Sequence, residues 1–407
     1  MAAPADADAE RAPRLPGTVV GLGVTSLLTD TSSEAIFPLL PAFLVSLGAP
    51  SWFIGLVEGL AELVANALKY LTGLLADRSA RLKPLVLAGY CLSTAARPLV
   101  AFALAPWHVL VIRSLDRVGK GVRTSPRDAL IASVADPAIR GRAFGFHRAM
   151  DHAGAALGTL LAAVGLTLLG ATGGATPENA EKMRTVFLWA AVPGVLAVVA
   201  LALTPEPVRE APPASASSKR GGEPLPPALK RALVPLVLFA FANATDAFLL
   251  VKAAKLGASP VLAPVLWLVL HVVKASTATA GGRLADRHGK RSALVLGWCV
   301  YGLLWSAVGF VDSIPILFVL TAAYGTSHGL VEGAERALIA DLASGKARGK
   351  AFGAYNLVIG LAALVSSTAF GAVWDRFGSV AAFAGSGAFA LLAAAALLVL
   401  VPRPAAQ

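Results

Sequence analysis

The sequence alternates between long apolar stretches and short polar segments over most of its length. A helix that crosses the hydrocarbon core of a bilayer needs about 20 mostly apolar residues. We place such stretches at 18–46, 52–75, 84–104, 107–133, 143–168, 185–204, 232–255, 260–283, 292–311, 314–340, 350–371 and 378–401. The pattern therefore predicts an all-α integral membrane protein with twelve transmembrane helices.

A repeated motif indicates that the two halves of the chain are related. GLLADRSARLK at 73–83 has a near copy, GRLADRHGKR, at 282–291, and RGRAFG at 140–145 returns as RGKAFG at 348–353. Colinear matches about half a chain apart are typical of an internal duplication. We therefore expect two six-helix bundles, 18–204 and 232–401, related by a pseudo-two-fold axis.

The composition agrees with a membrane protein and changes the interpretation of the charge. The chain is 56% hydrophobic and 14% charged, far from the usage of soluble domains. The net charge of +11 could suggest nucleic acid, but the basic residues outside the stretches nearly all lie on the side of the two termini. Only Lys182, Arg184 and Arg376 fall on the other side. The positive-inside rule then places both termini in the cytoplasm, and no nucleic-acid partner is expected.

The remaining segments read as tails and a linker. Residues 1–17 and 402–407 are expected to be cytoplasmic tails, and 205–231, rich in Pro, Ala and Ser, a flexible cytoplasmic linker. The start of the chain lacks the pattern of a signal peptide. Cys91 and Cys299 lie in apolar stretches and form no disulfide framework. No metal or cofactor is expected, and the Ala, Gly, Pro and Arg usage suggests a bacterial gene, hence the inner membrane.

Ionisable residues inside the predicted spans mark the candidate functional site. Each costs at least about 2.5 kcal/mol at the centre of a lipid-facing helix, so each must face protein or water. Stretch 107–133 carries most of them on one helical face. Polar faces from several helices predict an aqueous cavity at the junction of the halves. Its candidate residues are Asp30, Glu34, Glu62, Arg113, Arg117, Lys120, Asp151, Asp246, Glu332 and Arg336.

Two interpretations of these charges stay open at this point. Glu332 and Arg336, four residues apart, could simply neutralise each other, and so could Glu62 and Lys69. The excess of basic residues in 107–133 instead favours an anionic partner. A carboxylate in such a cavity could also exchange a proton with changing conformation, and Glu34 and Asp151 are the best candidates for that role.

The repeated motif resembles the G-x-L-A-D-R-x-G-R-K signature of the major facilitator superfamily of secondary transporters, and the resemblance covers essentially the whole chain. The matching positions include Gly73, Asp77, Arg78, Arg81, Gly282, Asp286, Arg287 and Lys290. The first copy departs from the signature at Ala80 and Leu82. The resemblance implies a cytoplasmic gate in which Asp77 meets the helix start near Gly349 and Asp286 the one near Gly141 when that side is closed.

Arg117 and Gly121 match a second family motif, R-x-x-Q-G, with Lys120 in the glutamine position. In relatives this arginine faces the cavity and is tied to substrate or proton coupling. The resemblance also implies a monomer.

Two classes of function remain after the motifs are considered. The leading hypothesis is a secondary transporter that moves an anionic or zwitterionic small solute, with proton coupling, by rocker-switch alternating access. The alternative within that class is a multidrug/proton antiporter that exports amphipathic or cationic compounds. A sensor that kept the fold without flux is a further class. An enzyme is not expected, because neither HExxH nor GxSxG nor a phosphate-binding loop is present.

Overall fold

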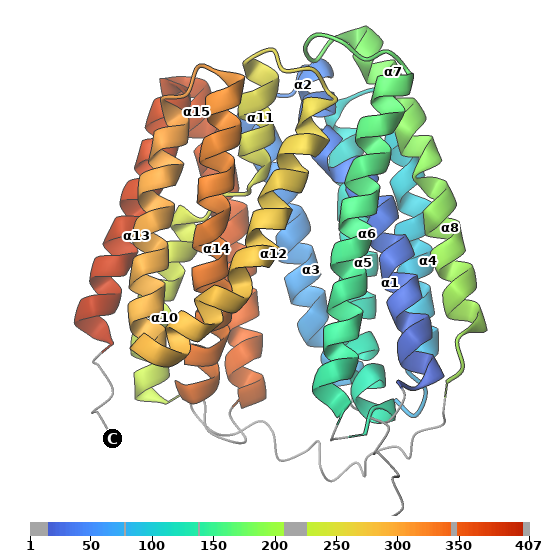
Figure 1. Cartoon of the computed structure of the whole chain (residues 1–407), viewed down its shortest axis with the longest axis vertical. Coiled ribbons are helices and arrows are strands. Elements are labelled where there is room, and N and C mark those ends of the chain that lie inside the picture. Colours follow the sequence, from blue (N-terminus) through green and yellow to red (C-terminus); the bar gives the residue numbers. More distant parts are fainter. Residues whose placement is uncertain (1–14, 77–78, 137–138, 207–225, 343–347, 402–407) are drawn as a thin grey trace, which may run out of the picture.

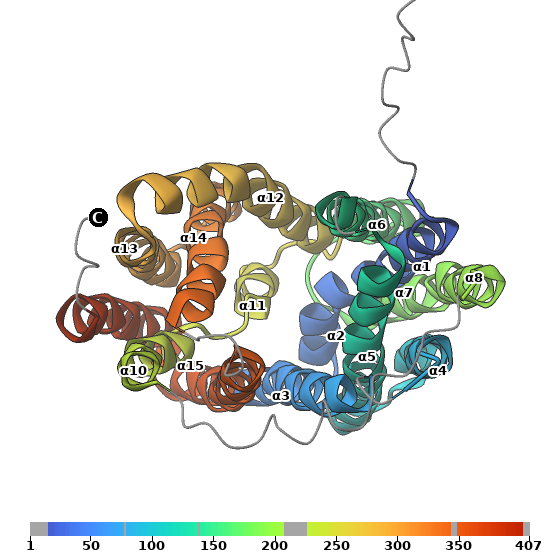
Figure 2. The ribbon, with the colours of Figure 1, turned by 90° about the horizontal axis from the view of Figure 1, so that it is seen from below.

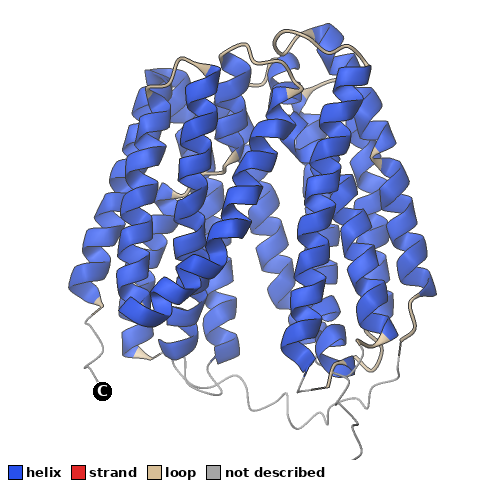
Figure 3. Cartoon of the chain, viewed as in Figure 1, coloured by secondary structure: helices blue, strands red, loops and turns tan. Residues whose placement is uncertain are grey.

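The computed structural model describes residues 15–76, 79–136, 139–206, 226–342 and 348–401, and every regular element in these ranges is a helix (Figure 3). The expected tails and linker fall largely outside these ranges. The first half of the chain forms α1 (Gly17–Ile36), η1 (Phe37–Leu39), α2 (Leu40–Ser46), α3 (Ser51–Ala76), α4 (Lys83–Ala96), η2 (Arg97–Phe102), α5 (Pro106–Val134), α6 (Arg140–Leu168), α7 (Pro177–Trp189) and α8 (Ala191–Leu203). The second half forms α10 (Pro227–Ala242), α11 (Ala247–Lys255), α12 (Leu262–His288), α13 (Lys290–Gly309), α14 (Ile314–Leu342) and α15 (Arg348–Leu400).

Nine helical segments in the described ranges are long and apolar enough to cross a membrane. The hydrophobic pattern thus predicted an all-helical membrane protein correctly. Helix α5 is outside the nine because its charged residues are too many for an ordinary span. Tyr355–Leu400 is one of the nine, although Gly378 interrupts it with φ 86° and ψ 170°. That backbone conformation is easily reached only by glycine, and it lets the chain reverse direction there.

Proline and glycine positions explain most of the breaks in the helices. Pro38 and Pro41 interrupt the first span, where a 3-10 turn separates α1 from α2. The turn η2 follows α4 in the same way, with Pro98 near its start. One break has no proline: α10 ends at Ala242 and α11 begins at Ala247. Pro235, by contrast, lies inside α10 without ending it.

The helices before and after the central linker lie on opposite sides of the molecule (Figures 1 and 2). The main contacts between the two sides are those of α3 with α15, α6 with α12, and α2 with α11. We call the end at which α1 begins and α8 ends the lower end, and the end at which α2 and α11 lie the upper end, as in Figure 1. The second half has an aromatic core that includes the fully buried Trp298, Trp305, Tyr301 and Tyr324.

Candidate functional site

The charged face of α5 begins with a buried ion network. Arg113 Nη2 lies 3.0 Å from Glu58 Oε2 on α3, and its Nη1 lies 3.4 Å from Asp116 Oδ2. Asp116 Oδ1 is also 2.9 Å from Arg97 Nε. The four side chains are only 4–8% exposed, and two positive charges meet two negative ones. Arg113 therefore lies where sequence analysis placed it, on the polar face, but it is fully neutralised.

Arg97 is a member of this network that sequence reasoning missed. Its Nη1 also donates to the carbonyl oxygen of Thr29 at 3.0 Å, which joins η2 to α1. The available signal was an isolated arginine in the otherwise apolar stretch 84–104, since a charge in a span implies a partner.

Arg117 and Lys120 lie one and two turns below this network and differ from it. Neither side chain makes a hydrogen bond within the described residues, and the buried Arg117 Nε has no partner there. The carboxylates that act electrostatically on Arg117 are those of Asp116, Glu58 and Glu62, and those that act on Lys120 are Glu62 and Asp30. A buried unpartnered N–H such as Arg117 Nε costs about 1–3 kcal/mol, which makes Arg117, with the neighbouring Lys120, the position most ready for an anionic ligand.

The carboxylates near Arg117 and Lys120 differ in their contacts and burial. Glu62 is linked to Lys69 through Asn66, whose amide donates to Glu62 Oε1 at 2.8 Å and accepts from Lys69 Nζ at 3.0 Å. Asp30 is half-buried.

The carboxylate of Asp151 on α6 accepts a hydrogen bond from Ser26. It also lies 3.5 Å from His147 Nδ1 and 3.8 Å from Arg148 Nη1.

Glu34, one of the predicted cavity residues, takes part in a hydrogen bond between the two halves of the chain. Its Oε2 accepts from Trp267 Nε1 on α12 at 2.8 Å. The Trp267 ring packs against Phe37 and His271, with a centroid distance of 4.8 Å in both cases. Sequence reasoning did not single out Trp267, because a tryptophan in an apolar stretch carries no signal for a polar contact.

The second half has its own polar centre at the break between α10 and α11. Asp246, directly before α11, accepts from Lys274 Nζ and from the Tyr324 hydroxyl, both at 2.6 Å. His328 Nε2 lies 3.7 Å from Asp246 and 3.0 Å from the same hydroxyl. The carbonyl of Ala242 accepts from Tyr301 at 3.1 Å. Side chains thus supply hydrogen-bond partners for polar groups at this break, as a non-helical segment at membrane depth requires.

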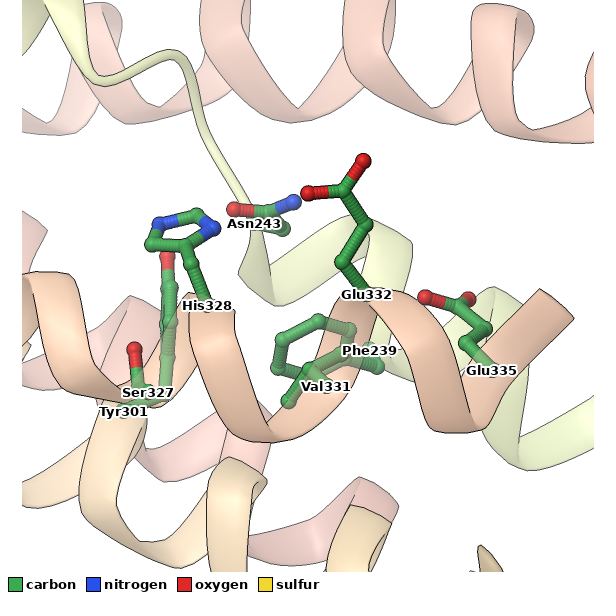
Figure 4. A pocket seen from close by; sticks show the side chains of 8 residues that line it. All are labelled: Phe239, Asn243, Tyr301, Ser327, His328, Val331, Glu332 and Glu335. Atoms are coloured by element: carbon green, nitrogen blue, oxygen red, sulfur yellow. The ribbon is translucent and has the colours of Figure 1, made fainter. Parts of the chain in front are cut away.

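A cavity of about 160 Å³ opens beside this centre (Figure 4). Asn243, His328 and Glu332 border it, and Glu335 lies one turn further along α14 (Figure 4). Phe239, Tyr301, Ser327 and Val331 complete its lining. The side chain of Arg336, which the sequence paired with Glu332, lies outside the described part of the structure.

The repeated gate motif is only partly described. Asp77 and Arg78 lie outside the described residues, whereas Gly73 lies near the lower end of α3. Arg81, Asp286 and Arg287 are exposed, and Gly282 lies in the last turns of α12. Lys290 forms an ion pair with Asp341 at the end of α14. The contact expected between Asp286 and the region of Gly141 stays a prediction.

A distal latch, formed by Ser51, Lys255 and Asp375, joins the halves at the upper end. The Asp375 carboxylate accepts from the backbone N–H groups of Ser51 at 3.1 Å and Trp52 at 2.9 Å, the first residues of α3. Lys255 Nζ donates to Ser51 Oγ at 2.8 Å and lies 3.8 Å from Asp375 Oδ1. A carboxylate at a helix N-terminus meets both unpaired N–H groups and the positive end of the helix dipole.

We expect Asp375→Asn to loosen the upper end. Hydrogen bonds to charged groups contribute about 1.5–3 kcal/mol, so maleimide labelling of a cysteine at Ala171, buried at this end, should rise roughly tenfold. The reporter chain would carry Cys91→Ala and Cys299→Ala. Asp312→Asn, at an exposed acid of the same end, serves as the control, and equal labelling in the two variants would remove Asp375 from closure.

Comparisons with known proteins agree with this architecture. The profile described as Major Facilitator Superfamily matches residues 22–273 and 236–407. A protein of Methanocaldococcus jannaschii described as an uncharacterised MFS-type transporter is 32% identical over 362 residues, 87% of each chain. The multidrug resistance protein MdtH of Yersinia pestis is 32% identical over 137 residues, 33% of this chain and 34% of MdtH. The crystal structure of the nucleoside transporter NupG, D323A mutant, superposes with a TM-score of 0.75 at 12% identity, covering 95% of this chain and all of NupG.

The profile match spans nearly the whole chain, the archaeal relative is similar over most of its length, and the helices are those of a multi-pass membrane protein. The resemblance seen in the two copies of the gate motif is therefore confirmed. The chain belongs to the major facilitator superfamily, whose members are transporters of small molecules in lipid bilayers rather than enzymes.

Proposed function

We propose that this protein is a secondary active transporter that moves an anionic or zwitterionic small solute with proton coupling. Twelve spans, arranged as two six-helix bundles related by a pseudo-two-fold axis, would alternate access by rocking about a site between them. The choice of solute rests on the pair Arg117 and Lys120. Their side chains make no hydrogen bond within the described residues, although they lie next to the fully neutralised network of Arg97 and Arg113.

A ligand carboxylate or phosphate would supply what these two cations lack. Bidentate recognition of such groups is a property of the planar guanidinium, while lysine adds a compact charge. The acidic and aromatic cavity near Asn243 and Glu332 in the other half suits a cationic or hydrogen-bonding part of the same solute. This division between the two halves favours a zwitterion or an anion with a polar tail.

The topology belongs to the same proposal. With both termini in the cytoplasm of a bacterial inner membrane, the lower end of Figure 1 faces the cytoplasm, and the distal latch closes the opposite side. The solute would then enter or leave through the lower end in this conformation. The chain would act as a monomer, and Glu34 and Asp151 are candidates for the proton.

Multidrug export is the second candidate function, and one observation favours it. A third of the chain is similar to the multidrug resistance protein MdtH, and the acids Glu34, Glu62, Glu332 and Glu335 could attract a lipophilic cation. An anionic solute would need Arg117, whereas a lipophilic cation would need the acids. Substitutions at these residues therefore distinguish solute transport from multidrug export.

We expect Arg117→Gln to abolish stabilisation and exchange of an anionic solute. Leaving one partner of a desolvated charge pair without the other costs about 2–5 kcal/mol, roughly a hundredfold in affinity. Thermal unfolding of the purified protein is measured with lactate, succinate, citrate, amino acids, sugars and tetraphenylphosphonium, and counterflow in proteoliposomes is measured for any compound that stabilises it.

Arg142→Gln, which removes an exposed arginine at the lower end, is the matched control for Arg117→Gln. Stabilisation by tetraphenylphosphonium alone, unaffected by Arg117→Gln and lost in Glu34→Gln, would support multidrug export instead. Stabilisation without counterflow for any compound would favour a sensor.

A further inference from the structure

Helix α11 connects two polar centres of the molecule. It is a nine-residue helix, about 14 Å long at 1.5 Å per residue, and its first seven residues are buried. Asp246 directly precedes its first turn and is held by α12 and α14. Lys255, its last residue, contacts Ser51 and Asp375 in the distal latch. A displacement of one end of this short helix therefore also displaces the other end.

The surroundings of Asp246 differ from those of the other buried acids. Asp116 is held by two arginines, whereas the fully charged group paired with Asp246 is a single lysine, Lys274. A lysine ends in a compact ammonium on a flexible stem and can withdraw. The other titratable groups that face Asp246 are His271 from α12, Tyr301 from α13, and Tyr324 and His328 from α14.

The chain is interrupted at this carboxylate. Residues 243–246 are not helical, the backbone N–H of Thr245 donates to Ser367 Oγ at 3.1 Å, and Asn243 borders the adjacent cavity. Discontinuous helices within the membrane are where repeat-built transporters bind substrates and coupling ions. His328 both lines the cavity and contacts the Tyr324 hydroxyl, so a solute in the cavity touches the same hydrogen-bond network.

We propose that Asp246 binds and releases the coupled proton, and that α11 transmits its protonation state to the distal latch. The proposal rests on the proton coupling included in the proposed function and assigns the proton to a residue other than Glu34 and Asp151. Asp246 is a positioning and proton-binding residue for transport, and the latch is the element that responds.

The direction of the effect follows from the ion pair. In this conformation the charged Asp246 carboxylate holds Lys274 Nζ at 2.6 Å. A proton on Asp246 removes the negative charge that attracts Lys274. This lysine, whose side chain is 22% exposed, is then left partly buried without a charged partner. Protonation therefore favours a conformation in which Lys274 has withdrawn and α11 has moved. Acid is expected to open the upper end, and alkali to keep it latched.

A solute-free measurement tests the proposal. The cysteine reporter at Ala171, in the chain with Cys91→Ala and Cys299→Ala, is labelled in proteoliposomes from about pH 5.5 to about pH 8.5. This is the range in which a carboxyl group inside a protein can titrate once its cationic partner has withdrawn. Labelling should rise about tenfold toward acid pH, which corresponds to about 1.4 kcal/mol of conformational bias. In Asp246→Asn it should be fast at every pH.

Three further variants serve as controls for this measurement. Asp246→Asn combined with Lys274→Gln removes both charges, so it should fold even if the single variant does not, and it should show no pH dependence. Asp151→Asn and Glu34→Gln should keep the pH dependence of the parent. Labelling is referred to a denatured sample at each pH, which corrects for the chemistry of the thiol itself.

The outcomes separate this inference from the proposed function. If Asp246→Asn and the double variant respond to pH as the parent does, or if the parent does not respond, Asp246 is not the coupling residue. If the response disappears in Asp151→Asn or Glu34→Gln instead, the proton belongs there. Counterflow of an anionic solute and its loss in Arg117→Gln are independent of all these results, so failure of the inference leaves that test of the proposed function intact.

Discussion

Asp116→Asn is expected to lower the free energy of unfolding by about 3–5 kcal/mol, the usual cost of removing one partner of a buried ion pair. Asp116 compensates both Arg97, at 2.9 Å, and Arg113, at 3.4 Å. Without its charge, the buried guanidinium group of Arg97 would lose its charged partner, and Arg113 would keep only the carboxylate of Glu58. Chemical denaturation of the protein in detergent micelles measures the change.

A double variant distinguishes lost compensation from a local packing effect. Arg97→Gln combined with Asp116→Asn restores the charge balance and should recover much of the lost stability. Asp128→Asn removes a carboxylate from an ion pair with Arg127 in which Asp128 is 46% exposed, and such pairs contribute about 0–1 kcal/mol. Equal destabilisation by Asp116→Asn and Asp128→Asn would mean that the network does not support the fold.

Gly55→Ala is expected to disrupt the contact between the two halves. A Cβ atom at Gly55 on α3 would lie 2.0 Å from the carbonyl oxygen of Ser367 on α15, and one at Gly371 would lie 2.3 Å from that of Ser51. Backbone atoms cannot move aside as a flexible side chain does. Overpacking costs about 1–3 kcal/mol or more, so both stability and solute exchange should fall.

Gly385→Ala is the matched control on α15, since a Cβ atom there meets nothing within 4 Å. Alanine has the higher helix propensity by about 1 kcal/mol, so this control should be neutral or slightly stabilising. Thermal unfolding and proteoliposome exchange are compared for the two variants. Similar behaviour of Gly55→Ala and Gly385→Ala would show that α3 and α15 are not packed through their glycines in the working protein.

The helical membrane fold could be predicted from the sequence because it depends on local composition. Apolar stretches of spanning length and the prolines at 38 and 41 act on their own segments. The copies of the gate motif around Asp77 and Asp286 are also visible without structure, and they led to the family. Charges such as Arg117 and Asp246 stood out as candidates because a charge in a span is costly wherever its partner lies.

The partners of those charges came only from the tertiary structure. Helical periodicity gives the direction of a side chain but not the neighbouring helix, so the pairing of Arg113 with Arg97 through Asp116 was not predictable. The break at 243–246 contains no proline and is stabilised by Tyr301 and Ser367 from distant helices. The sequence thus determined which segments enter the membrane and which carry charge. The packing of the halves decided which cations stay unpartnered and which end is latched, because both depend on contacts between segments far apart in the chain.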